Sequence, residues 1–279
     1  MSEPRVILDG LAYVESPRWH DGRLWFAHWG TDEIIAVGLD GTSEVFARGS
    51  GGLGWSIDWL PDGRLLVTGA GLTRVEPDGS LVPHADVSRL AGDWNELAVD
   101  GRGNVYVNGR CEFDFTGGDP VGIIALVTPD GEVRQVADRI AFPNGMVVTP
   151  DNRTLIVAES IAEKLTAFEI ADDGSLSKRR TWADGVGADG ICLDDDGAIW
   201  AQSGAMSTTC VRVCEGGEVL ERVDLDRSPF ACMLGGPDGR TLFILAAEWR
   251  GFENIESAIA DRTGQVLVTS APARHAGWP

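Results

Sequence analysis

The sequence has few of the features that mark membrane, secreted or nucleic-acid-binding proteins. No apolar run approaches the roughly 18 residues that a membrane-spanning helix needs, and the N-terminal residues lack the basic-then-apolar pattern of a signal peptide. Lysine and arginine number 23 against 43 aspartates and glutamates, which gives a formal net charge of −20. Because such a surface repels nucleic acid and anionic membranes, we expect a cytoplasmic protein that binds neither.

Cysteine and histidine are also scarce, which argues against a disulfide framework and a zinc centre. The five cysteines are odd in number and show no dense pattern, as expected in a reducing compartment. Cys210 and Cys214 form a lone C-x3-C without a nearby histidine, and the four histidines share no ligand spacing. Neither a Gly-x-Ser-x-Gly motif nor a P-loop is present, so serine-hydrolase and nucleotide chemistry lack support.

No helical period of useful length is visible, but two families of turns repeat along the chain. The first family has its turns at residues 22, 63, 103, 152, 197 and 239, which are 41, 40, 49, 45 and 42 residues apart. The second family, mostly Asp-Gly, lies between them at 40–41, 78–79, 130–131, 173–174, 216–217 and 263–264. Asp-Gly between short apolar runs predicts a β-hairpin.

Two hairpins in each of six repeats predict an all-β fold, a six-bladed β-propeller with four antiparallel strands per blade. We expect one domain over residues 1–279, since no linker divides the chain. Ring closure should pair a terminal strand, residues 5–8 or 265–269, with the other end of the chain.

Polar residues occupy the same position in four of the six repeats, seven or eight residues before the first turn. They are Glu15, Asn95, Asn144 and Asp189. In a propeller this position lies at the mouth of the central channel, where the innermost strand begins on the face opposite the turns. Two carboxylates and two amides satisfy one another poorly there but suit a hard divalent cation.

We therefore predict a site for one divalent metal ion, with Ca²⁺ favoured and Zn²⁺, Mn²⁺, Mg²⁺ or Fe²⁺ as alternatives. The competing interpretation is that Asn144 and Asp189 only bond the backbone where their strands begin.

Long loops and tryptophans are expected on the same face. The longest loops predicted there are 108–120 and 246–256, and binding residues often lie on such loops. Ten tryptophans exceed the needs of a core of this size, so some could shape a pocket for an apolar or ring-shaped ligand. Trp55, at the channel mouth in the second repeat, is one predicted substrate contact; ordinary packing is the alternative.

These motifs resemble the gluconolactonase family, which includes regucalcin. The segments that carry the resemblance are 15–19, 94–96, 142–145, 189–194 and 232–236. The resemblance implies a six-bladed propeller that binds a divalent metal through Glu15, Asn144 and Asp189. It also implies that Asp189 is the catalytic base and that Asn95 binds the metal or orients the substrate.

The chain departs from the sugar-lactone members at two positions. Asp93 stands where those members carry arginine, and Glu96 stands where aspartate is common. We predict that Glu96 contacts substrate, together with Arg110 and Glu112 from the third repeat. The expected function is metal-dependent hydrolysis of a lactone or related ester, a small-molecule substrate. A phosphotriesterase and a non-catalytic calcium-binding propeller are the alternatives, and the oligomeric state stays open.

Overall fold

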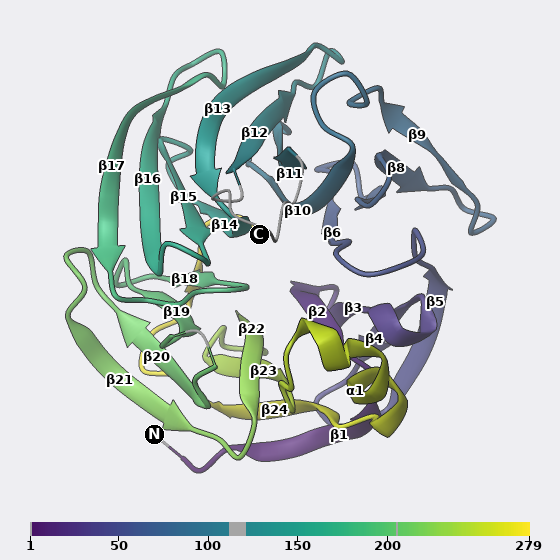
Figure 1. The fold of residues 1–279 in the computed structure, drawn as a ribbon, viewed down its shortest axis with the longest axis vertical. Helices are drawn as coiled ribbons and strands as arrows, with labels where there is room; N and C mark the ends of the chain where they lie inside the picture. The colour runs from purple at the N-terminus through teal and green to yellow at the C-terminus, as the bar shows by residue number, and fades with distance from the viewer. Residues whose placement is uncertain (1, 112–120, 205) are drawn as a thin grey trace.

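Six small antiparallel sheets form a closed ring around a central axis (Figure 1). The computed structural model describes residues 2–111, 121–204 and 206–279. The predicted six-bladed β-propeller is therefore confirmed. None of the helices in these residues is long and apolar enough to span a membrane.

The first three blades follow the order of the chain, each with its innermost strand first. Blade 1 contains β2 (Val14–His20), β3 (Arg23–His28), β4 (Glu33–Val37) and β5 (Ser43–Arg48), with a short 3-10 helix, η1 (Trp29–Thr31). Blade 2 contains β6 (Ile57–Trp59), β7 (Leu65–Val67), β8 (Leu72–Val75) and β9 (Leu81–Ala85). Blade 3 contains β10 (Asp93–Val99), β11 (Val105–Cys111), β12 (Val121–Val127) and β13 (Val133–Ala141).

The last three blades include both ends of the chain. Blade 4 contains β14 (Pro143–Val148), β15 (Thr154–Glu159), β16 (Lys164–Ile170) and β17 (Leu176–Asp184). Blade 5 contains β18 (Cys192–Asp194), β19 (Ile199–Gln202), β20 (Thr209–Val213), β21 (Val219–Asp224) and the tail strand β25 (His275–Ala276). Blade 6 contains β22 (Ser228–Gly235), β23 (Thr241–Ala247), β24 (Gly264–Ser270) and, outermost, β1 (Arg5–Leu11).

The ring closes through β1, which pairs antiparallel with β24. This confirms the expected closure by a terminal strand. The C-terminal tail makes a second connection, because β25 pairs with the inner strand β18 and Trp278 forms a bridge with Val148 of β14. The tail therefore crosses from blade 5 to blade 4 at the end of the channel that carries the first family of turns.

Blade 6 departs from the prediction. Gly264 is not in a hairpin turn but is the first residue of β24, because the fourth strand comes from the N-terminus. The segment between β23 and β24 forms a second 3-10 helix, η2 (Phe252–Asn254), and the helix α1 (Ile255–Asp261). No pattern in the sequence predicted this helix. Its seven residues are too few to show a helical period, and such a short helix depends on tertiary packing.

Apolar side chains fill the spaces between neighbouring blades. Ala98, Tyr106 and Ile124 of blade 3, for example, pack in one cluster with Met146 and Leu155 of blade 4. The inner strands are thus rigidly held on both sides, which fixes the direction of the side chains at their ends.

Candidate active site

The four predicted channel-mouth residues line one cavity. Glu15, Asn95, Asn144 and Asp189 all contribute to a cavity of about 530 Å³, a volume typical of small-molecule sites. Three of them are almost fully buried, and Asp189 is partly buried. The spacing of the repeats therefore predicted correctly which polar residues meet.

β-bulges direct these side chains. The register of β2 skips between Glu15 and Arg18, that of β10 skips between Trp94 and Leu97, and that of β14 skips between Pro143 and Met146. Bulges bend a strand and redirect its side chains, and they are common beside active sites. In β10 and β14 the bulged residues include Asn95 and Asn144.

Glycine follows two of the site residues because the next blade lies against the backbone there. A Cβ atom at Gly145 would come within 2.7 Å of the carbonyl oxygen of Asp189, and one at Gly190 within 2.5 Å of Ala231 Cβ. Close packing permits two backbone hydrogen bonds, from Gly145 N to Asp189 O at 3.1 Å and from Gly190 N to Phe230 O at 2.8 Å. The ends of the inner strands of blades 4, 5 and 6 are thereby joined.

Side chains from the second strands and the loops after them tie further inner strands together. Asn108 of β11 accepts a hydrogen bond from Glu96 N at 3.1 Å and donates one to Asn144 O at 2.7 Å. Ser160 Oγ donates to Ala188 O at 2.9 Å, next to Asp189. Asn108 is fully buried and Ser160 is half-buried, and both hold the backbone of site residues in position; Ser160 also lines the cavity.

Below the cavity a buried polar network continues along the channel. The Ser16 and Ser56 hydroxyls lie 2.5 Å apart, and Ser56 Oγ donates to Glu96 Oε2 at 3.0 Å. Arg18 lies 3.5 Å from Glu96 and 3.7 Å from Asp58. Glu96 is therefore placed in this network, and it is not among the residues that line the cavity.

The site carries more negative than positive charge. Burial, followed by the charges of Asp189 and Glu96, raises the pKa of Glu15 above its usual value. Burial and the charge of Glu96 raise the pKa of Asp189 to about 7, against a hydrogen bond from Asn144 that lowers it. Arg18 lowers the pKa of Glu96 and Glu15, but burial prevails and both carboxyls titrate above their usual range. Among the described residues that line the cavity there are three carboxylates, of Glu15, Glu163 and Asp189, and no cationic side chain.

The residues available for a metal are Glu15, Asp189 and the two asparagines. No cluster of three or more His, Cys, Asp or Glu side chains with metal-binding geometry occurs in the described residues, so any site here depends on amide oxygens as well. Two carboxylates and two amides match the all-oxygen ligand sets of hard divalent cations. The unbalanced negative charge is the feature of the site that such an ion would neutralise.

The remaining predicted contacts have other positions. Trp55 is fully buried and packs between blades 1 and 2 with Trp25 and Ile57, so the structure does not bring it to the cavity. Arg110 lies in β11, paired with Asp93 of β10, and its side chain is not described. Glu112 lies outside the described residues.

An aromatic wall forms one side of the cavity, and it includes two of the tryptophans expected on this face, Trp29 and Trp249. It consists of Tyr13, Trp29, Phe230 and Trp249. Tyr13 packs on Phe230 with ring centroids 5.0 Å apart and on Trp249 at 6.2 Å. The two-residue period of a strand could not have found Tyr13, because Tyr13 precedes β2 and has a positive φ of 52°.

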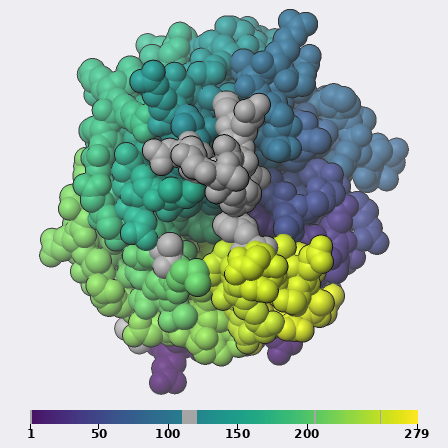
Figure 2. Space-filling view, in the orientation of Figure 1, coloured from purple at the N-terminus to yellow at the C-terminus, as the bar shows by residue number. Residues whose placement is uncertain are grey.

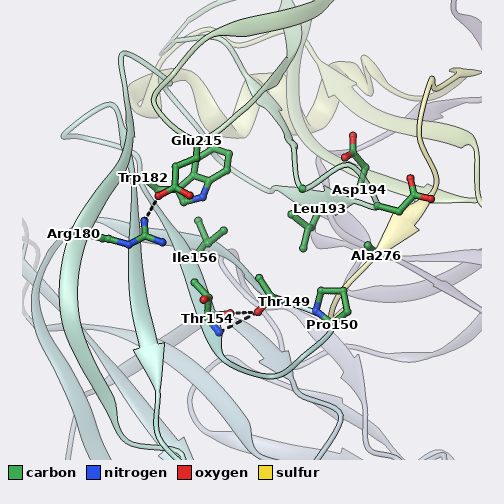
Figure 3. Close-up of a pocket in the computed structure, with 12 residues that line it drawn as sticks. Thr149, Pro150, Thr154, Ile156, Arg180, Trp182, Leu193, Asp194, Glu215 and Ala276 are labelled. Atoms are coloured by element: carbon green, nitrogen blue, oxygen red, sulfur yellow. Dashed lines mark hydrogen bonds and ion pairs between the residues drawn. The ribbon is translucent and has the colours of Figure 1, made fainter.

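A second cavity, of about 310 Å³, opens between blades 4 and 5 (Figure 3). It is lined by first-family turn residues such as Pro150 and Gly197, so it belongs to the opposite face. Arg180 pairs with Glu215 at 2.6 Å and Asp194 with Arg212 at 2.6 Å, while Asp195 accepts a hydrogen bond from Arg274 N at 2.7 Å. The charged side chains that line this cavity therefore have partners within the protein.

Fold and site together define a six-bladed β-propeller enclosing an acidic small-molecule pocket at one end of its channel. The profile of the SMP-30/gluconolactonase/LRE-like region matches residues 13–248. The chain belongs to this family.

Two curated relatives and one solved structure illustrate the similarity. The chain is 28% identical over 201 residues to diisopropyl-fluorophosphatase of Loligo vulgaris, covering 64% of this chain and 62% of that protein. It is 26% identical over 170 residues to regucalcin of Xenopus laevis, covering 56% of each. The matches thus span less than two thirds of either relative. The structure of a calcium-binding protein, regucalcin from Agrobacterium tumefaciens, superimposes with a TM-score of 0.77 at 20% identity, covering 98% of this chain and 94% of that one, which shows the shared fold.

Proposed function

We propose that the protein is a divalent-cation-dependent hydrolase of lactones or related esters. The observation that supports this most directly is the meeting of two carboxylates and two amides on the floor of a cavity large enough for a small molecule. Membership of a family whose name includes gluconolactonase agrees with the proposal.

In this proposal Glu15, Asn144 and Asp189 hold the cation, and Asn95 either completes the ligand set or orients the substrate. A bound divalent cation supplies Lewis-acid polarisation of a carbonyl oxygen and lowers the pKa of a nearby water. As the oxygen of a water molecule bonds to the carbonyl carbon, the Asp189 carboxylate accepts a proton from that water. The ring C–O bond of the lactone then breaks, and the proton passes to the departing ring oxygen.

The buried surroundings suit these roles. Asn144 and Asp189 are fixed through Gly145 N and Asn108, so little reorganisation is needed when substrate binds. The apolar wall excludes water from one side of the carboxylates, which strengthens every electrostatic interaction inside the cavity.

The test is a lactone panel assayed with chelated protein to which Ca²⁺, Mg²⁺, Mn²⁺, Zn²⁺ or Fe²⁺ is restored singly. We expect hydrolysis to disappear on chelation and to return with one or more of these ions. Full, chelator-resistant hydrolysis would contradict the role of the cation, and no hydrolysis of any lactone with any ion would contradict the activity.

Phosphotriester hydrolysis is a second candidate, favoured by the relative named diisopropyl-fluorophosphatase. The same preparations should be assayed on a phosphotriester panel. Faster turnover there than on every lactone would select this alternative. A non-catalytic calcium-binding propeller is less favoured, because the cavity above the polar floor stays open for a ligand.

A further inference from the structure

The walls of the candidate active site differ sharply from its floor. The polar side chains gather at the channel mouth, where several already bond one another or the backbone, as Glu15 does with Ser16 N at 2.9 Å. Around them stand the aromatic wall and Ile255 of α1. In Figures 1 and 2 the chain segment that carries α1 lies on the near face, beside the centre of the ring.

The mouth of the cavity carries three exposed apolar side chains from three different parts of the ring. Leu53 is 44% exposed, Ile161 is 52% exposed and Met206 is 63% exposed, and all three line the cavity. Exposed apolar groups that gather around one opening mark a binding surface, whereas isolated ones need no explanation. They come from the connection before β6, the loop after β15 and the loop after β19.

The cavity is unfavourable for an anion. Among the described residues that line it there is no lysine, arginine or histidine, whereas Glu15, Glu163 and Asp189 are acidic. A substrate with a free carboxylate or phosphate would therefore find no side-chain countercharge among these residues, and the charge of the proposed cation is already balanced by Glu15 and Asp189.

One polar group on the aromatic wall lacks a partner. The Tyr13 hydroxyl is buried and has no hydrogen-bond partner among the described residues, although Tyr13 lines the cavity and lies near Glu15 and Asp189. A buried hydroxyl without a partner is costly and requires an explanation. An acceptor oxygen of a bound ligand would satisfy it.

We infer that the substrate is an uncharged lactone or ester with a compact apolar group, aromatic or alicyclic, and that Tyr13 donates a hydrogen bond to one of its oxygen atoms. The apolar group lies against the aromatic wall while the ester group faces the polar floor. This inference rests on the proposed hydrolase function, and it makes a polyhydroxylated sugar lactone a poor substrate, because its hydroxyls would lose water against the aromatic wall.

The first test compares dihydrocoumarin with glucono-δ-lactone on the metal-restored protein. We expect kcat/KM to favour dihydrocoumarin by roughly 10-fold to 100-fold, the factor given by burial of one apolar ring. A preference for the sugar lactone would overturn the inference while leaving the hydrolase proposal intact.

A binding test separates the two proposals if no lactone is hydrolysed. Two uncharged analogues that cannot be hydrolysed, 4-chromanone and 1,5-anhydroglucitol, are titrated while tryptophan fluorescence is recorded, since Trp29 and Trp249 line the cavity. Tighter binding of 4-chromanone supports the inferred ligand class even without turnover. Equal or weaker binding would overturn it.

The two tyrosines provide a matched pair of variants for the hydrogen bond. Tyr13→Phe removes a hydroxyl without a partner, so we expect unchanged or higher thermal stability and a loss of roughly threefold to tenfold in kcat/KM for dihydrocoumarin. Tyr106→Phe removes a hydroxyl that donates to Gly174 O at 3.0 Å outside the cavity, so it should lower stability and leave kcat/KM unchanged. Unchanged kcat/KM in Tyr13→Phe, or equal effects of the two variants, would overturn the role of Tyr13.

Discussion

The two cavities differ in whether their charges are satisfied. Around the cavity between blades 4 and 5, Asp194 is paired with Arg212 and Arg180 with Glu215. In the candidate active site burial and the charge of Asp189 raise the pKa of Glu15, and the Tyr13 hydroxyl has no hydrogen-bond partner within the described part of the chain. The charged groups around the cavity between blades 4 and 5 have protein partners without a ligand. In the candidate active site the carboxylates of Glu15 and Asp189 remain available for the proposed cation. This difference is more informative than cavity volume.

The largest effect is expected on folding stability, when one partner of a buried ion pair is removed. Asp194→Asn removes the buried partner of the Arg212 guanidinium and leaves it only Asp196, whose side chain is 65% exposed, at 2.7 Å. Asp194 also accepts a hydrogen bond from Ala198 N at 3.0 Å. Loss of one partner of a buried pair costs about 3–5 kcal/mol, which chemical denaturation can measure. Metal-dependent turnover per folded molecule should not change. Equal loss of turnover would show that the two cavities are not independent.

In the active site an Asp-to-Asn replacement should lower catalytic activity instead of stability. Asp189→Asn and Asn144→Ala should each lower kcat/KM on the best lactone by at least about 100-fold, since even residues behind metal ligands contribute 10-fold to 100-fold. In metal-free protein, Asp189→Asn should not destabilise the fold, because it removes a charge that Glu15 and Glu96 oppose. A clear drop in metal-free stability would assign Asp189 a structural role instead.

The network below the site should give a pH-dependent stability. Burial raises the pKa of Asp58 to about 6 despite the Arg18 charge. The folded protein therefore binds this proton more tightly than the unfolded chain does. The resulting stabilisation is fully present below about pH 4 and is lost as the pH rises through about 6.

In wild type the Asp58 carboxyl should lower the free energy of unfolding by roughly 2–3 kcal/mol between pH 4 and pH 7. Asp58→Asn should remove this pH dependence. Denaturant unfolding in the presence of chelator measures this for both proteins. Parallel curves for wild type and variant would show that Asp58 does not titrate in that range.

The smallest effect is expected at the exposed pair of the second cavity. Arg180 and Glu215 lie 2.6 Å apart but are about half exposed, and exposed pairs contribute about 0–1 kcal/mol. Glu215→Gln should therefore alter neither stability nor turnover measurably. A change in lactone turnover would connect this cavity to the active site and weaken the comparison.

The repeating parts of the molecule were predictable from the sequence, since the blades share one pattern. The first-family turns and the first five Asp-Gly-type turns connect the strands that they predicted, and the positions of Glu15, Asn95, Asn144 and Asp189 converge as the repeat requires. Blade 6 was less predictable because its fourth strand comes from the N-terminus. A local turn signal cannot predict pairing between strands so far apart in the sequence.

The repeat also could not predict the orientation of side chains that depart from its pattern. Trp55 has the same offset as the site residues, but it turns into the packing between blades 1 and 2. The bulges decide which residue of an inner strand faces the cavity, and they depend on contacts between blades. The aromatic wall joins residues from blades 1 and 6 that are far apart in the sequence.

The closure of the ring has a consequence for synthesis in the cell. Arg5 pairs with Val268, so β1 leaves the ribosome long before its partner exists. Until then β1 presents an unpaired edge, which is prone to aggregation. The site residues from Glu15 to Asp189 can reach their final positions only when the last blade has been made. Catalytic competence should therefore be acquired late, in a single closing step, and not blade by blade.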